Sequence, residues 1–109
     1  MNELEQRTCR ALPADARPLA QPQIESFLAL LPGWAHQDGA IDKVFSFGSY
    51  AQTMAFVNGV AAIAERENHH PDMLVSYDKC RVSYSTHSIG GISENDFICA
   101  AKIEALCRP

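Results

Sequence analysis

The chain has 109 residues, a length typical of one domain with one site. Nine lysine and arginine residues against thirteen aspartate and glutamate residues give a net charge of −4, which offers no overall basic surface for direct nucleic-acid binding. Hydrophobic residues make up 47% of the chain, and no apolar stretch approaches the ~18 residues of a membrane span. The first residues are acidic where a signal peptide would be basic, so we expect a cytoplasmic protein that does not bind membranes.

The beginning of the chain predicts a lead-in followed by a short helix. Residues 1–21 contain two prolines and no clean periodicity, and we expect a tail or an irregular lead-in there. From Pro22 onwards, apolar residues follow helical spacing until Pro32-Gly33 ends the run.

A β-hairpin is predicted next. Asp38-Gly39 lies between two β-prone runs, residues 34–36 and 41–47. Because Asp-Gly tolerates the positive φ angles of a tight hairpin turn, we expect two antiparallel strands here.

A long helix is predicted from residue 50 to about residue 68. Ser49 suits its N-cap, and the residue before Pro71 is pushed out of the helical region, so the helix ends by about His70. The face predicted to be buried consists of Tyr50, Met54, Val57, Ala61 and Ala64, widened by Phe56, Val60 and Ile63.

The last third of the chain predicts a second hairpin and a final helix. Alternating residues 73–77 and 80–85 predict two strands about an Asp78-Lys79 turn. A flexible loop is expected over residues 89–92. Ser93 with Asp96 is typical of an N-terminal cap for a helix over residues 94–106.

This order predicts an α+β two-layer sandwich, with about three helices on one face of a four-stranded sheet, in a single domain over residues 22–109. The long helix joins the second strand to the third, and those two strands either pair in parallel or lie apart. The four cysteines show no Cys-x-x-Cys pair, so we expect reduced thiols.

Three of the four histidines, His69, His70 and His87, lie where predicted elements end. An imidazole with an ordinary pKa of ~6.5 can both give and take a proton near neutrality, so such a cluster suits proton transfer without a cofactor. Glu65 precedes His69 by one helical turn and would orient or charge-stabilise an imidazole.

Two other interpretations of the histidines stay open on spacing alone. Zinc could be bound by the three histidines with Glu65 or Asp72, although consecutive histidines rarely converge on one tetrahedral ion. Alternatively, the histidines merely terminate elements. Phosphate-binding and nucleophile motifs are absent from the sequence.

A longer pattern around the histidines resembles a known signature. The run Glu65-Arg66-Glu67-Asn68-His69-His70-Pro71, followed by Tyr77, then Ser85-Thr86-His87 and Asp96, is similar to that of the pterin-4a-carbinolamine dehydratases. The similarity extends to Leu31-Pro32-Gly33-Trp34, to Phe45 and Phe47, and to Gly91-Ile92-Ser93, so it covers roughly residues 22–106.

The resemblance implies a fold, a reaction and partners. The implied fold has a four-stranded antiparallel sheet with helices on one side, in a homodimer or homotetramer. The implied reaction removes water from 4a-hydroxytetrahydrobiopterin to give quinonoid dihydrobiopterin, which recycles the pterin cofactor of aromatic amino acid hydroxylases. The resemblance implies no metal and no cofactor, and it makes a hydroxylase the functional partner. The natural pterin side chain stays open.

The resemblance also implies roles for particular residues. His69, His70 and His87 would be catalytic, with His70 and His87 as acid and base in either order. The implied substrate-binding or orienting residues are Glu65, Asn68, Pro71, Thr86, Asp96 and Trp34. Trp34 is as typical of plain core, and Asp96 of a helix cap, which does not exclude a role in the site.

One position departs from the family pattern, and one alternative function remains. Asn95 stands where many relatives carry a basic residue, so we expect the loss of a cationic contact to the ligand or to a neighbouring subunit. The alternative is a protein-interaction role, because some animal members also act as dimerisation partners of a homeodomain transcription factor. The three histidines favour the enzyme, since a scaffold alone would need none of them.

Overall fold

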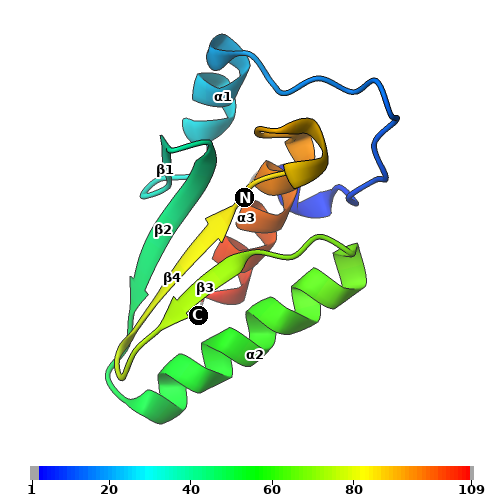
Figure 1. Ribbon diagram of the computed structural model, residues 1–109. Coiled ribbons are helices and arrows are strands. Elements are labelled where there is room, and N and C mark those ends of the chain that lie inside the picture. Colours follow the sequence, from blue (N-terminus) through cyan, green and yellow to red (C-terminus); the bar gives the residue numbers. More distant parts are fainter. Residues whose placement is uncertain (1–2, 109) are drawn as a thin grey trace.

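The computed structural model describes residues 3–108 (Figure 1). In chain order its elements are η1 (Glu3–Gln6), α1 (Gln21–Leu28), β1 (Ala35–Gln37), β2 (Ala40–Ser46), α2 (Tyr50–Glu67), β3 (Asp72–Val75), β4 (Lys79–Tyr84), η2 (His87–Ile89) and α3 (Glu94–Leu106), where η marks a short 3-10 helix. The predicted α+β order of helices and strands is confirmed. The final helix has the bounds that its Ser93 cap predicted.

The four strands form one antiparallel sheet in the order β1-β2-β4-β3. β4 pairs with β2 from Ile41 opposite Tyr84 to Ser46 opposite Lys79, and β3 pairs with the other edge of β4. β2 and β3 therefore lie apart, which answers the question that the sequence left open. The helix α2 connects them across one face of the sheet (Figure 1).

The sequence located the turn of the first hairpin correctly and that of the second less accurately. Asp38 and Gly39 have φ angles of 53° and 75°, so the first turn lies at the predicted pair. The second turn was predicted at Asp78-Lys79, and it lies one residue earlier, with Tyr77 and Asp78 at its centre. The Ser76 N–H donates to the Lys79 carbonyl at 2.9 Å and closes the turn earlier, which leaves Tyr77 in the turn and 66% exposed.

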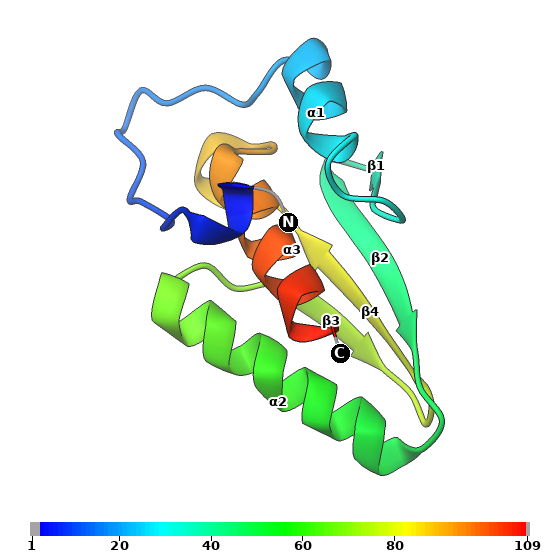
Figure 2. The same ribbon diagram turned by 180° about the vertical axis from the view of Figure 1, so that it is seen from behind.

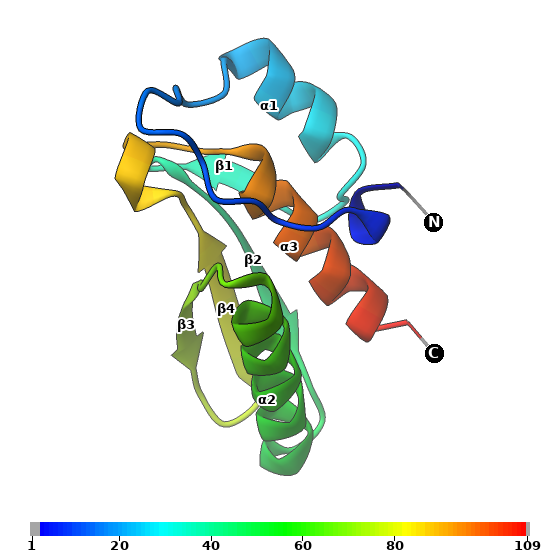
Figure 3. The same cartoon turned by 90° about the vertical axis from the view of Figure 1, so that its right-hand side faces the viewer.

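The core lies between the sheet and the helices, and α2 and α3 lie on the same side of the sheet (Figure 3). Its members from the strands are Ile41, Phe45, Cys80, Val82 and Tyr84, and those from α3 include Phe97, Ala100, Ala101 and Ile103. On α1, Phe27 stacks on Phe97, with 4.9 Å between the ring centroids. Gly59 lets the helices approach, because a Cβ there would lie 2.7 Å from a methyl carbon of Leu106.

The predicted buried face of α2 is partly wrong. Tyr50 is 51% exposed and Ala61 is exposed, whereas the buried residues are Thr53, Phe56, Val60, Ile63, Ala64 and Glu67. Two of these are polar and were not expected in the interior. The Thr53 hydroxyl donates to the Ser49 carbonyl, and Glu67 accepts from the Cys9 N–H, so both are buried without loss of hydrogen bonding.

The N-terminal segment, residues 3–12, lies against α3, and the chain then turns away towards α1 (Figure 2). Leu4 in η1 is 1% exposed and belongs to the core. The predicted lead-in is thus irregular over residues 7–20 but begins with a packed 3-10 helix. Within residues 3–108, no helix is long and apolar enough to cross a membrane.

Candidate active site

Asp96 joins the end of α2, the end of β4 and the beginning of α3. Its side chain is fully buried. One carboxylate oxygen, Oδ1, lies 2.5 Å from Nε2 of His69, which follows α2. The other oxygen, Oδ2, accepts from the Thr86 hydroxyl at 2.8 Å, and Thr86 follows β4. Three segments that are distant in the sequence are therefore held together by one carboxylate.

The sharp end of α2 places His69 towards Asp96. Asn68 adopts the left-handed conformation, with φ 52° and ψ 45°, which ends a helix and which asparagine tolerates better than most residues. Pro71 then keeps His70 out of the helical region. Asn68 and Pro71, both predicted as site residues, shape the turn that presents the two histidines.

Ser93 completes the hydrogen bonding around Asp96. The Ser93 N–H donates to Asp96 Oδ2 at 2.9 Å, as the predicted cap requires, and the Ser93 and Thr86 hydroxyls lie 2.7 Å apart. Ser93 was expected only as a cap, and its link to Thr86 was missed. The Thr86 hydroxyl and the Ser93 N–H therefore both donate to the same oxygen of Asp96, while Oδ1 faces His69.

The environment of His69 favours its charged form. Burial lowers the pKa of His69, but the hydrogen bond and the negative charge of Asp96 outweigh it, so the pKa is raised above its ordinary value. The ring of Tyr84 stacks on the imidazole, with 5.5 Å between centroids and 11° between planes. Tyr84 was not predicted as part of the site, although strand alternation directs it inwards at the end of β4. His69 is thus fixed in position and biased towards the imidazolium.

His70 lies outside this buried network. Its Nε2 is 2.7 Å from Oε2 of Glu65, one turn earlier on α2. The side chain of His70 is 54% exposed and that of Glu65 is 79% exposed. The predicted contact between Glu65 and the histidine turn is present, and it leaves Nδ1 of His70 free of this bond.

His87 lies at the start of η2 and is exposed. The Thr86 N–H donates to the Gly91 carbonyl at 2.8 Å, so the loop that carries His87 is closed at its base. His70 follows His69 and His87 follows Thr86. Each exposed histidine therefore directly follows, in the chain, a residue that hydrogen-bonds to Asp96.

Trp34 lies in the core. It is 6% exposed, its Nε1 donates to Oε2 of Glu104 at 2.9 Å, and its ring packs edge-on against Phe45. Glu104 is about two helical turns from Asp96 along α3. The structure therefore joins Trp34 to the far half of α3 and gives it no hydrogen bond to the histidines.

We expect Trp34→Phe to lower the free energy of unfolding by about 1–2 kcal/mol, because it removes a hydrogen bond to a carboxylate and part of a buried ring. The rate of the dehydration that the family resemblance implies should stay within about twofold of that of the unsubstituted chain. Urea unfolding and the dehydration assay check the two statements. A large loss of rate in a stably folded variant would place Trp34 in the substrate site.

Asn95 has a contact that a lysine or arginine could not make. Its Oδ1 accepts from the Arg10 N–H at 3.1 Å, and its Nδ2 donates to the Arg10 carbonyl at 2.7 Å. A basic side chain has donors only, so it could not pair with both backbone groups. In this chain, Asn95 fixes the N-terminal segment on the beginning of α3.

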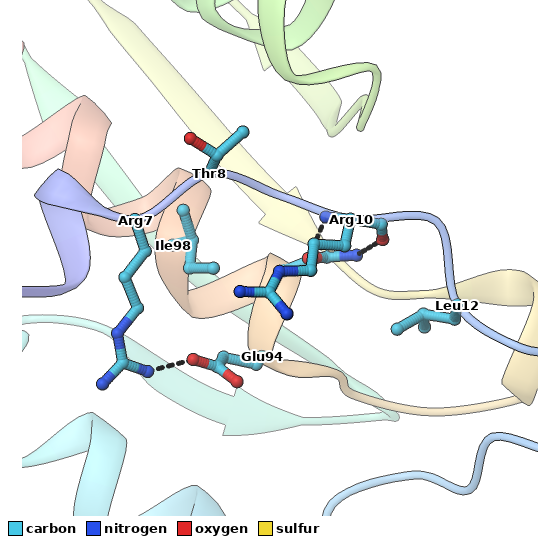
Figure 4. A pocket seen from close by; sticks show the side chains of 7 residues that line it. Arg7, Thr8, Arg10, Leu12, Glu94 and Ile98 are labelled. Carbon is cyan, nitrogen blue, oxygen red and sulfur yellow. Dashed lines mark hydrogen bonds and ion pairs between the residues drawn. The ribbon is translucent and has the colours of Figure 1, made fainter.

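A cavity among the described residues lies away from the histidines. It has a volume of about 430 Å³ between the N-terminal segment and α3, and it is lined by Arg7, Thr8, Arg10, Leu12, Glu94, Asn95 and Ile98 (Figure 4). Arg7 forms ion pairs with Glu94 and Glu3. These two carboxylates neutralise the positive charge that Arg7 would otherwise offer to a ligand. The cavity contains none of the three predicted histidines.

The side chains of the described residues do not support a zinc site. In the range 3–108, no group of three or more histidine, cysteine, aspartate or glutamate side chains is arranged to hold a metal ion. His69 is bound to Asp96 and His70 to Glu65, on separate carboxylates.

The fold and these side chains define an α+β domain with histidine and carboxylate pairs suited to acid–base chemistry, and comparison with known proteins agrees with that class. The family model described as pterin 4 alpha carbinolamine dehydratase matches residues 17–106. A protein of Nitrosospira multiformis named after the same dehydratase is 51% identical over 106 residues, which cover 97% of this chain and 94% of that protein.

Solved structures give the same result. The transcriptional coactivator/pterin dehydratase from Brucella melitensis is 30% identical, with a TM-score of 0.81 over 84% of this chain and 100% of that one. A pterin dehydratase-like protein described as a RuBisCO assembly factor in the alpha-carboxysome is 28% identical, with a TM-score of 0.56 over 67% of this chain and 84% of that one. The chain belongs to the pterin-4a-carbinolamine dehydratase family.

Proposed function

We propose that this chain is a hydro-lyase that removes water from 4a-hydroxytetrahydrobiopterin and releases quinonoid dihydrobiopterin. The observation that carries the proposal is that two exposed imidazoles, His70 and His87, directly follow His69 and Thr86, both of which hydrogen-bond to Asp96. Family membership supports the reaction class. The geometry supports the residue types, because the reaction consists of proton transfers on one small ligand.

The reaction needs an acid and a base on the same substrate. One proton must reach the departing 4a-hydroxyl, and another must leave the neighbouring ring nitrogen. We assign these steps to His70 and His87, since both are exposed to a ligand. Glu65 holds His70 through Nε2, so Nδ1 of His70 is the atom that faces the substrate. The exposed pair of Glu65 and His70 contributes little to the free energy of unfolding. Its role is to orient the imidazole of His70.

His69 has a different part in this proposal. Asp96 occupies its Nε2, and the imidazolium form is favoured. In its protonated form, His69 has one remaining N–H, which can donate to a pterin ring atom and stabilise negative charge that develops there. Thr86, which is 7% exposed, positions Asp96 and the base of the His87 loop.

The proposed partners follow from the reaction. An aromatic amino acid hydroxylase supplies the substrate, and the two enzymes share a pterin pool. We place the reaction in the cytoplasm, which agrees with four free cysteines among the described residues. We also propose a homo-oligomer, because Leu74 on the edge strand β3 is 70% exposed and Tyr77, in the turn after β3, is 66% exposed. Light scattering of the full chain measures this directly, and a monomer would contradict it.

A coupled assay tests the proposed function. An aromatic amino acid hydroxylase working at limiting tetrahydropterin accumulates the 4a-hydroxy compound, and addition of this chain should restore the rate of cofactor recycling. We expect the same acceleration after treatment of the chain with a chelator, since no step is assigned to a metal. Loss of the acceleration on chelation, with recovery on adding zinc, would overturn the metal-free proposal.

A further inference from the structure

Two cysteine sulfurs meet beside the candidate site. Sγ of Cys9, in the N-terminal segment, lies 3.5 Å from Sγ of Cys99 on α3. Cys99 is fully buried, one turn beyond Asp96, and Cys9 is half-buried. A disulfide requires a separation of about 2.05 Å, so a movement of roughly 1.5 Å would bring the two sulfurs to bonding distance.

The backbone around Cys9 is anchored in a way that keeps the two sulfurs together. The Cys9 N–H donates to Oε1 of the buried Glu67 at 2.9 Å. The next residue, Arg10, is held through both of its backbone groups by Asn95, which lies one turn before Cys99 on α3. The dithiol is therefore pre-organised by hydrogen bonds on both sides of Cys9. Close contact of two thiols across 90 residues of sequence follows from that anchoring.

We propose that Cys9 and Cys99 are a modification site, at which a low-molecular-weight disulfide oxidises the pair to an intramolecular disulfide that fixes the N-terminal segment on α3. The inference does not depend on the dehydratase activity. It concerns thiols that the proposed reaction does not use.

The chemistry takes two exchanges. In the first, the sulfur of Cys9, the more exposed of the two, bonds to one sulfur of the oxidant. The oxidant's S–S bond breaks, and its other sulfur leaves as a thiol with the proton of Cys9. In the second, the Cys99 sulfur attacks Sγ of Cys9, and the remaining oxidant sulfur leaves with the proton of Cys99. The two cysteines lose two electrons and two protons, and the oxidant gains both.

In the reduced dithiol the two sulfurs differ in acidity. The hydrogen bond from the Cys9 thiol lowers the pKa of Cys99 against the effect of burial, and the neighbouring His69 acts in the same direction. The same hydrogen bond, with burial, raises the pKa of Cys9. In the second exchange Cys9 is already bonded to the oxidant and donates no proton, so the positive charge of His69 still lowers the pKa of Cys99 there.

The positions of the other two cysteines decide the design of the test. Cys107 is exposed near the end of the chain, and Cys80 is buried within β4. The test uses the full chain carrying Cys107→Ser, which removes the exposed thiol and with it the main route to intermolecular disulfides. A second variant adds Cys9→Ser to that background.

Both variants are equilibrated with glutathione disulfide and glutathione over a series of ratios, free thiols are alkylated, and peptides are mapped by mass spectrometry. We expect the Cys107→Ser chain to yield a linked Cys9–Cys99 peptide, and its unfolding midpoint to rise by roughly 10 °C or more, because the link closes a loop of about 90 residues. The chain lacking Cys9 should gain neither. Alkylation of both cysteines at the most oxidising ratio, or a Cys9–glutathione adduct that never resolves, would overturn the proposal.

Discussion

Replacement of either His70 or His87 with alanine is expected to lower the catalysed rate of dehydration by ~100-fold or more, because each substitution removes a group that transfers a proton in the transition state. Both side chains are exposed, and neither belongs to the core. The free energy of unfolding should therefore change by less than about 0.5 kcal/mol. Stopped-flow kinetics and urea unfolding measure the two effects on the same samples.

His36 offers a matched control for these variants. It lies in β1, at the far edge of the sheet from β3, and no role is assigned to it. We expect His36→Ala to keep the dehydration rate within about twofold, which would show that loss of a histidine as such does not slow the reaction. Near-normal rates in both the His70 and the His87 variants would refute the acid–base assignment.

The second large effect is expected at Asp96. Asp96→Asn keeps the shape of the side chain but replaces one accepting oxygen with a donor, among partners that are themselves donors. We expect a loss of about 3 kcal/mol in the free energy of unfolding, since a fully buried, charge-assisted network is broken. Glu94→Gln is the control, because Glu94 lies on the same turn of α3 but is partly exposed, and it should cost less than about 1 kcal/mol.

The effect of Asp96→Asn should depend on pH in a defined direction. The pKa of His69 is raised in the folded protein, so its ion pair with Asp96 stabilises the fold below the ordinary imidazole pKa of ~6.5. This contribution is lost as the pH rises through the raised pKa. The difference in unfolding free energy between the unsubstituted chain and Asp96→Asn should therefore be larger at pH 5.5 than at pH 8.5. Equal differences at the two pH values would contradict the charged pair.

Local signals located the elements because each depends on a few neighbouring residues. Asp38-Gly39 supplies positive φ angles, Ser49 accepts from the Gln52 N–H, and Pro71 limits the preceding helix, so each boundary follows from short-range chemistry. The order of the strands could not be predicted in this way. It depends on which edge of β4 each strand joins, and that choice is made by packing of the whole sheet.

The predictions for α2 and for the lead-in missed residues that are buried by contacts with distant parts of the chain. Thr53 and Glu67 interrupt the apolar pattern of α2, and the sequence gives no sign that the Tyr77 carbonyl and the Cys9 N–H will satisfy them. Leu4 enters the core from a segment with no periodicity. These contacts join residues that are far apart in the sequence, and patterns within a short window do not contain them.

In the candidate site, too, contacts between residues close in the sequence could be predicted and contacts between distant residues could not. The contact between Glu65 and His70 was predicted because one helical turn separates Glu65 from the histidine turn. The resemblance implied a site role for Asp96, but its pairing with His69, 27 residues away, was not predicted. The stacking of Tyr84 on His69 and the link between Ser93 and Thr86 appeared only in the structure.

The central claim is that this chain catalyses the dehydration itself. Its most direct test follows the decay of chemically generated 4a-hydroxytetrahydropterin by stopped-flow ultraviolet absorbance, with and without the chelator-treated chain. We expect the chain to accelerate the decay in proportion to its concentration, with formation of the quinonoid product. An unchanged decay in the presence of chain shown to be folded by circular dichroism would contradict it.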